Sequence, residues 1–102
     1  MAGAAKVLGG RVGWEAIVKA VEQEKGERWM EFRDRYGDWG RDVALWLGRT
    51  VGRRRLQELA GKVGGVDCRA AGAAVGRVGR GLAADASYRY RVQRIKARLS
   101  NV

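Results

Sequence analysis

The sequence contains no histidine and no proline, and Cys68 is its only cysteine. Without histidine, the chain cannot build a Ser-His-Asp triad, a histidine-ligated zinc site or a two-histidine nuclease centre. One cysteine cannot form an internal disulfide, which excludes a small secreted scaffold held by disulfide bonds. Catalysis by carboxylates or lysine is compatible with the composition, although no motif favours it. We therefore expect a protein that is not an enzyme and that uses no metal and no cofactor.

Long apolar runs are also missing. No stretch approaches the roughly 18 apolar residues that a membrane-spanning helix requires. Residues 1–10 contain one lysine among small side chains and lack the apolar core of a signal peptide. The sequence thus predicts a cytoplasmic protein with no membrane partner, and 102 residues allow one compact domain.

The charge that is present is unevenly distributed. The net charge is +10, with 21 Lys plus Arg against 11 Asp plus Glu. Residues 1–51 hold nine basic and eight acidic residues, a net charge of +1, whereas residues 52–102 hold twelve and three, a net charge of +9. All four tryptophans lie in the first half, where their helical spacing favours a role in the core. The second half has the charge of a surface that binds a polyanion, or of a solvated surface without a partner.

Apolar residues recur at helical spacing through most of the chain, and clean strand-like alternation is absent. We predict an all-α fold of about six helices, in which a flexible N-terminal tail (1–12) precedes a single helical domain (13–102). The apolar faces of the six helices are Trp14, Ile17, Val18 and Val21; Trp29, Phe32 and Tyr36; Val43, Trp46 and Leu47; Leu56, Leu59, Ala60 and Val63; Ala71, Ala74, Val75, Val78 and Leu82; and Tyr88, Val92, Ile95 and Leu99. Asp38 and Asp67 are expected N-caps, and Gly26 is an expected C-cap. Cys68 is expected to be a partly buried packing residue.

The fourth and fifth predicted helices have the arrangement of a helix-turn-helix over about residues 56–82, with a turn at Gly64 and Gly65. Opposite the apolar face of the fifth helix lie candidate base-reading residues: Arg69, Ala73, Gly76 and Arg80, with Arg77 on the flank. Arginine can donate two hydrogen bonds to a guanine edge, and small residues let a helix approach the groove floor. No acidic residue stands between Cys68 and Ala84. The alternative interpretation is a surface helix whose arginines contact only water.

Further basic residues are candidates for phosphate contacts, which give affinity without reading sequence. These candidates are Arg49, Arg53, Arg54, Arg55 and Lys62. Arg91, Arg94 and Arg98 form another stripe on the last predicted helix, for which a solvated face is the simpler interpretation.

Several stretches resemble a known family. The sequence GDWGRDVALWLGR (37–49) looks like the linking helix of REP-associated (IS200-like) transposase proteins. The segments LQELA (56–60), GGVD (64–67) and 70–77 resemble the C-terminal DNA-binding domain of those proteins. That domain is itself similar to the C-terminal domain of the replication initiator DnaA, in the Trp-repressor-like helix-turn-helix group. The resemblance covers about residues 14–102, and the Gly-Gly-x-Asp turn is its most specific part.

The resemblance implies that the residues after Asp67 read bases, and the matching positions are Cys68, Arg69 and Ala70. DnaA-like proteins carry His and Ser or Thr there, and the transposase relatives carry an aromatic residue and Ser, so we expect a different target site. The family's catalytic domain uses two histidines for a metal and a tyrosine nucleophile. This chain lacks histidine, and it is too short to contain that domain, so it resembles only the DNA-binding tail.

The sequence therefore predicts a Trp-repressor/DnaA-like helix-turn-helix bundle that binds double-stranded DNA and is associated with the nucleoid. Because helix-turn-helix domains often bind as dimers, a homodimer is a further expected partner. Two alternatives stay open: a protein that binds RNA or a single-stranded hairpin, and a helical interaction module with an acidic protein partner.

Overall fold

The computed structural model of the chain describes residues 12–64 and 66–100. Its elements are α2 (Trp14–Lys25), α3 (Trp29–Phe32), α4 (Trp39–Thr50), α5 (Leu56–Lys62), α6 (Cys68–Ala84) and α7 (Ala86–Ser100). The prediction of an all-α fold with about six helices is confirmed, and the described residues contain no strand. Apart from Val12, the predicted N-terminal tail lies outside the described residues.

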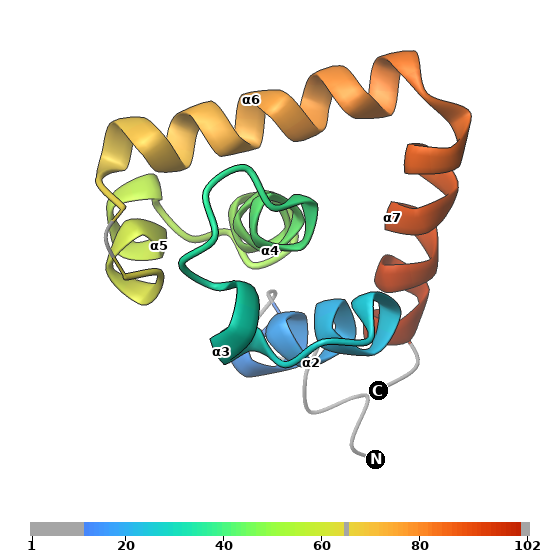
Figure 1. Cartoon of the computed structure of the whole chain (residues 1–102), viewed down its shortest axis with the longest axis horizontal. Helices are drawn as coiled ribbons and strands as arrows, with labels where there is room; N and C mark the ends of the chain where they lie inside the picture. Colours follow the sequence, from blue (N-terminus) through green and yellow to red (C-terminus); the bar gives the residue numbers. More distant parts are fainter. Residues whose placement is uncertain (1–11, 65, 101–102) are drawn as a thin grey trace.

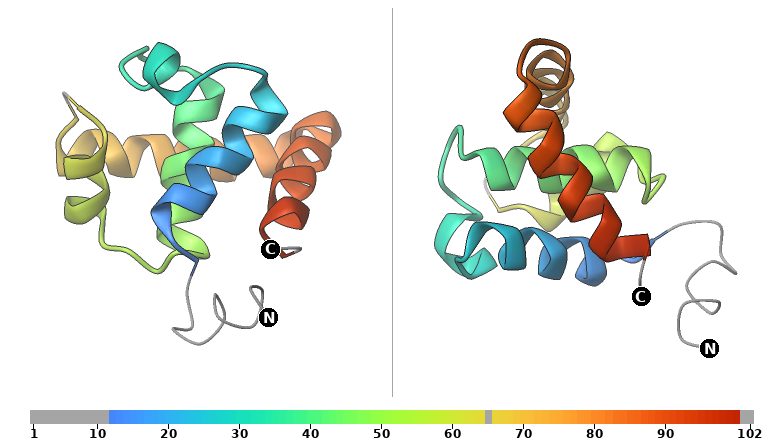
Figure 2. Two further views of the ribbon diagram at one scale, coloured as in Figure 1. Left: turned by 90° about the horizontal axis from the view of Figure 1, so that it is seen from below. Right: turned by 90° about the vertical axis from the view of Figure 1, so that its right-hand side faces the viewer.

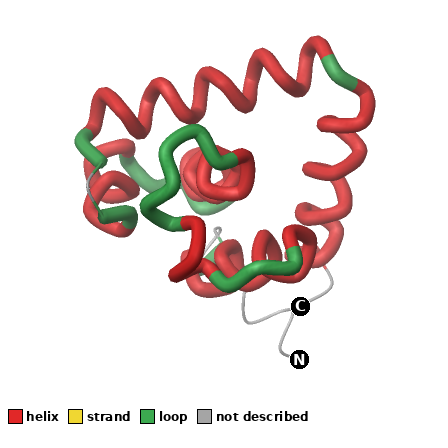
Figure 3. The backbone as a smooth tube through the Cα atoms, in the orientation of Figure 1, coloured by secondary structure: helices red, strands yellow, loops and turns green. Residues whose placement is uncertain are grey.

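Helix α4 lies at the centre of the fold (Figure 1). It is seen end-on in that view, with α6 crossing on one side and α2 on the opposite side. Helices α5 and α7 complete the surround, since α5 packs on α6 and α4, and α7 packs on α2 and α6. Figure 3 shows that short loops join these helices. The central position explains why eight of the twelve residues of α4 are buried.

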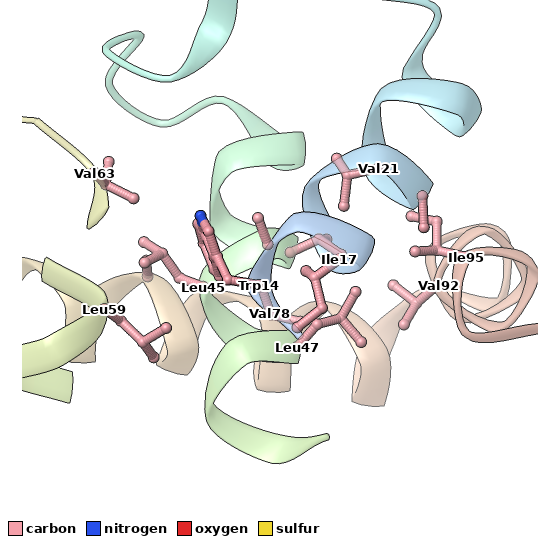
Figure 4. Packing of buried hydrophobic residues seen from close by; sticks show 14 of the residues in the cluster. Trp14, Ile17, Val21, Leu45, Leu47, Leu59, Val63, Val78, Val92 and Ile95 are labelled. Atoms are coloured by element: carbon pink, nitrogen blue, oxygen red, sulfur yellow. The ribbon is translucent and has the colours of Figure 1, made fainter. Parts of the chain in front are cut away.

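The core is built from the apolar faces of all these helices (Figure 4). Ile17 of α2, Leu47 of α4 and Leu59 of α5 are fully buried. Val78 of α6 and Ile95 of α7 close the core from the second half of the chain, and both are also fully buried. Burying a side chain of this size contributes about 1.5–3 kcal/mol. The predicted apolar spacing therefore corresponds to real inward faces.

Aspartates cap the helices that follow tight turns. The Asp38 carboxylate accepts hydrogen bonds from the backbone N–H groups of Gly40 (2.8 Å) and Arg41 (3.3 Å). Asp67 accepts from the N–H of Ala70 at 2.8 Å at the start of α6. Gly26 ends α2 with φ of 75°, in the left-handed region that favours glycine. The three predicted caps are confirmed.

Two local predictions are wrong. Tyr36 does not extend the apolar face of the second helix, because α3 ends at Phe32 and the Tyr36 side chain is 84% exposed in the following turn. Cys68 is exposed rather than partly buried, because it is the first residue of α6 and the buried face of that helix begins at Ala71. Among the tryptophans, Trp14 is buried in the core, while Trp29, Trp39 and Trp46 pack against it half-buried.

Candidate nucleic-acid interface

The outward face of α6 carries the predicted base-reading residues. Arg69, Ala73 and Arg80 are exposed, and Gly76 between them is half-buried. Ala71, Ala74 and Val78 are buried on the opposite side of the same helix. At 1.5 Å per residue, the seventeen residues of α6 form a helix about 25 Å long. The exposed face is therefore a straight surface with an arginine near each end.

Arg77 and Ala70 lie on a flank of α6 rather than on this face. Arg77 donates two hydrogen bonds to Asp42 of α4, from Nε (2.9 Å) and Nη2 (3.0 Å). These bonds, together with the Asp42 charge, raise the pKa of the Arg77 guanidinium. The guanidinium also lies 5.7 Å from the centre of the Tyr36 ring. Arg77 is thus committed to holding α6 against α4, which the sequence pattern alone did not reveal.

Four of the five predicted phosphate-contacting residues lie around the C-terminal end of α4 and the start of α5. Arg49, Arg53 and Arg55 are exposed, and Arg53 has φ of 54°. Arg54 differs, because its Nη1 pairs with Glu58 at 2.6 Å and its side chain is largely covered. Lys62, at the end of α5, is half-buried.

Two arginines that the sequence reasoning did not select line one hollow near the N-terminal end of α4. Arg41, in the first turn of α4, is only 9% exposed, and Arg33 follows α3. They line one hollow together with Asp34, Tyr36 and Gly64. No apolar spacing marks these residues, because the hollow forms where two connecting segments meet.

The crossing of α4 and α6 places these basic groups on both sides of α6. Because α4 runs roughly across α6, its two ends lie on opposite flanks of that helix (Figures 1 and 2). The contacts agree: Arg77 faces Asp42 near the start of α4, while Gly72 faces Leu56 at the start of α5. Twelve residues of α4 span about 18 Å. This length is comparable with a major groove about 12 Å wide.

The arginines of α7 are occupied by other contacts. Arg94 and Arg98 both bond Glu24 of α2, at 3.2 and 3.3 Å. The Arg91 guanidinium lies 4.6 Å from the centre of the Trp39 ring. These three arginines therefore pack α7 against α2 and α4. They form neither a solvated face without partners nor a surface that is free to contact phosphates.

Aromatic residues available for stacking on bases are few in the basic half. Tyr88 is half-buried against α6, where a Cβ at Gly81 would lie 3.2–3.3 Å from its ring. Tyr90 is exposed. Within residues 12–64 and 66–100, no group of three or more potential metal ligands occurs, and no helix is long and apolar enough to cross a membrane.

Comparison with known proteins gives no relative. No protein-family model, curated protein or solved structure matches the chain. The resemblance to transposase and DnaA-like domains therefore stays a prediction from the sequence.

Proposed function

We propose that the chain binds double-stranded DNA by placing α6 in the major groove. One observation carries this proposal: the solvent-facing side of α6 presents Arg69 and Arg80, and neither makes an ion pair within the part of the chain that the structure describes. No carboxylate occurs on α6 itself. A helix with this face attracts phosphate and meets no repulsion from acidic neighbours.

The contrast with the neighbouring arginines strengthens the argument. Arg54, Arg77, Arg94 and Arg98 each pair with a carboxylate, so these arginines have a charged partner within the fold. Arg69 and Arg80 contribute no such contact. Leaving them unpaired costs little in water, and it leaves their hydrogen-bond donors available to base edges or phosphates.

Each part of the surface then has a role. Arg69 and Arg80 contact base edges, and Ala73 and Gly76 allow α6 to approach the groove floor. Arg49, Arg53 and Arg55 contact phosphates on one side of the groove. Arg77 is a positioning residue, because its donors are committed to Asp42. In this proposal α5 and α6 act as a helix-turn-helix of the Trp-repressor or DnaA type, in a cytoplasmic protein associated with the nucleoid.

The first experiment measures the affinity for random duplex DNA across a salt series. We expect log K to fall linearly with log salt, with a slope of about −0.9 for each phosphate neutralised. Competition at fixed salt with hairpin DNA, RNA and an acidic protein then ranks the alternatives. A flat salt dependence, or stronger competition by any of these three competitors than by duplex DNA, would contradict the proposal.

The second experiment uses matched variants on selected duplex sites. Arg69→Ala and Arg80→Ala should each weaken binding by about 1–3 kcal/mol, the range of a base contact. Arg28→Ala is the charge-matched control, since Arg28 precedes α3 on the side of α4 opposite α6. Equal affinities for all three variants would show that α6 is not the reading helix.

A charge-insertion pair tests the same face without removing an arginine. Ala73 on α6 and Ala97 on α7 are both exposed alanines, so Ala73→Glu and Ala97→Glu change the net charge equally. Because a carboxylate on the α6 face would oppose phosphate, Ala73→Glu should bind DNA about tenfold more weakly than Ala97→Glu, or worse. Equal losses would indicate an unspecific charge effect.

A further inference from the structure

A hollow opens between the segment that joins α3 to α4 and the turn that joins α5 to α6. Its lining residues are Arg33, Asp34, Tyr36, Arg41 and Gly64, and its volume is about 520 Å³. The hollow opens broadly to solvent, and about 10–15 Å³ of space for the centres of water molecules is enough to hold one water. The hollow therefore has room for a phosphate group.

Arg41 is the unusual residue of this hollow. It is 9% exposed, yet its guanidinium has no hydrogen bond and no ion pair with any residue that the structure describes. Its nitrogens are not among the fully buried atoms that lack a partner, so the guanidinium reaches solvent in the hollow. An arginine in this state is suited to receive an anion from outside the chain.

The nearby carboxylates are already committed to other cations. Asp38 pairs with Lys25 at 3.1 Å and with Arg35 at 3.0 Å. Asp42 pairs with Arg77. These pairs explain why Arg41, which lies between Asp38 and Asp42 in the sequence, lacks an internal partner.

The other walls of the hollow suit an oxyanion. Asp34 is its only acidic residue, and its carboxylate accepts a hydrogen bond from Arg33 Nε at 3.4 Å. With two arginines and one aspartate, the lining carries a net charge of +1. A Cβ at Gly64 would lie 3.3 Å from Asp34 Oδ1 and 3.4 Å from Arg33 Nη2, so a side chain there would narrow the space. Guanidinium forks match the geometry of phosphate oxygens.

We propose that this hollow binds a phosphate group through Arg41 and Arg33. In its DNA form the inference rests on the proposed function: Tyr36 of the hollow lies beside Arg77 of α6, and the hollow takes a backbone phosphate on that flank. The segment 53–55 follows the other end of α4, and the two ends of α4 lie on opposite flanks of α6 (Figure 2). The same chemistry would accept free phosphate or the phosphate of a mononucleotide. The test has one arm for each source.

The first arm uses inorganic phosphate and the full chain. Phosphate should raise the unfolding temperature of the wild type more than chloride does at equal ionic strength. This extra gain should disappear in Arg41→Gln and in Gly64→Val, which fills the hollow without removing a charge. It should persist in Arg28→Gln, the surface control. The comparison for each variant is the gain in phosphate over chloride, so a purely structural role of Arg41 would lower the unfolding temperature in both salts and leave that gain unchanged.

The second arm uses duplex DNA across a salt series. Loss of one phosphate contact should make the slope of log K against log salt shallower by about 0.9 in Arg41→Gln. Arg41→Lys should keep most of the slope, because it retains the charge. Arg28→Gln should match the wild type.

The outcomes separate this inference from the proposed function. A phosphate-specific gain in a chain that binds no DNA would support the hollow and overturn the proposed function. A change of the DNA slope without a free-phosphate effect would assign the hollow to the DNA backbone. If Arg41→Gln and Gly64→Val behaved as the wild type in both arms, the hollow would not be a phosphate site, even with DNA binding intact.

Discussion

Helices α4 and α6 cross each other and both contain glycine, but α4 is mostly buried and α6 is mostly exposed. In α4, Asp42 is buried and paired, and eight of twelve residues are buried. In α6, three of seventeen residues are buried, and Arg69 and Arg80 project into solvent without an ion pair in the described chain. The difference shows that packing neutralises some arginines of the basic half and leaves others exposed. Asp42 and Glu24 of the first half neutralise Arg77, Arg94 and Arg98, and a smaller, defined set of arginines is left for a partner.

The largest difference in unfolding free energy between variants of the two helices should come from truncating an apolar residue in each. Leu47 of α4 is fully buried, so Leu47→Ala should lower the free energy of unfolding by about 2–5 kcal/mol. Leu82→Ala in α6 should cost less, because Leu82 is only half-buried. Urea denaturation of both variants measures this ranking. An equal loss would mean that α6 belongs to the core as fully as α4.

Glycines should respond in opposite directions in the two helices. A Cβ at Gly48 of α4 would overlap the Leu59 side chain and lie 3.1 Å from the Trp14 ring, so Gly48→Ala should destabilise the fold by about 1–3 kcal/mol. A Cβ at Gly79 of α6 would meet no atom within 4 Å. Gly79→Ala should therefore stabilise the fold by about 0.4–1 kcal/mol, because it restricts the unfolded chain. Thermal unfolding of the pair checks the sign of each change.

The ion pair that joins the two helices should matter more than an exposed pair. Asp42 is 6% exposed, so Asp42→Asn leaves Arg77 without its charged partner and should cost about 1–2 kcal/mol, discounted for the partial exposure of Arg77. Asp34→Asn is the control, because Asp34 is 64% exposed and should cost about 0.5 kcal/mol or less. A double-mutant cycle with Arg77→Gln would isolate the coupling, and a coupling near zero would contradict the anchoring role.

Reversing the charge of the exposed α6 arginines should leave the fold almost unchanged. The double variant Arg69→Glu/Arg80→Glu should unfold within about 0.5 kcal/mol of the wild type, because neither arginine makes an ion pair in the described structure. Reduced self-repulsion acts in the favourable direction. A loss as large as that of Asp42→Asn would show that these arginines serve the fold.

The smallest effect should come from pH. Burial of the Tyr88 hydroxyl between α6 and α7 raises its pKa above the usual 10.0. The stability linked to Tyr88 is therefore complete below about pH 10 and is lost as the pH rises through the folded-state pKa.

Lys25 also has a raised pKa. Burial opposes its charge, but its hydrogen bonds to Glu27 and Asp38 and the charges of those two groups outweigh burial.

The loss of stability at low pH should come from Glu27. Its hydrogen bonds to Lys25 and Arg35 lower its pKa, so its contribution is complete above the usual 4.5 and is lost as the pH falls. Unfolding measured across pH should give a plateau from about pH 5 to 9. The alkaline decline should be shallower in Tyr88→Phe, and an unchanged decline would remove Tyr88 from this account.

Much of the architecture was accessible from local patterns. The six helices, the caps at Asp38 and Asp67 and the inward faces of α2 and α6 follow from apolar spacing and from the hydrogen-bonding needs of helix ends. Tyr36 was misplaced because its spacing from Phe32 continues a helical pattern, whereas α3 ends at Phe32 and residues 33–37 form turns. The prediction for Cys68 failed because exposure at the first residue of a helix depends on the helix packed beneath it.

The sequence by itself determined that the chain forms helices, that its charge is concentrated in one half, and that α6 has an apolar face opposite an arginine face. Those properties depend on residues close together in the chain. Only the tertiary structure decided which arginines are neutralised, because Asp42 and Arg77, or Glu24 and Arg98, are distant in sequence and meet only after α4, α6, α2 and α7 have packed. It also decided that Arg41 is buried without a partner beside Gly64. That hollow exists only where two loops converge, so no periodicity along the chain encodes it.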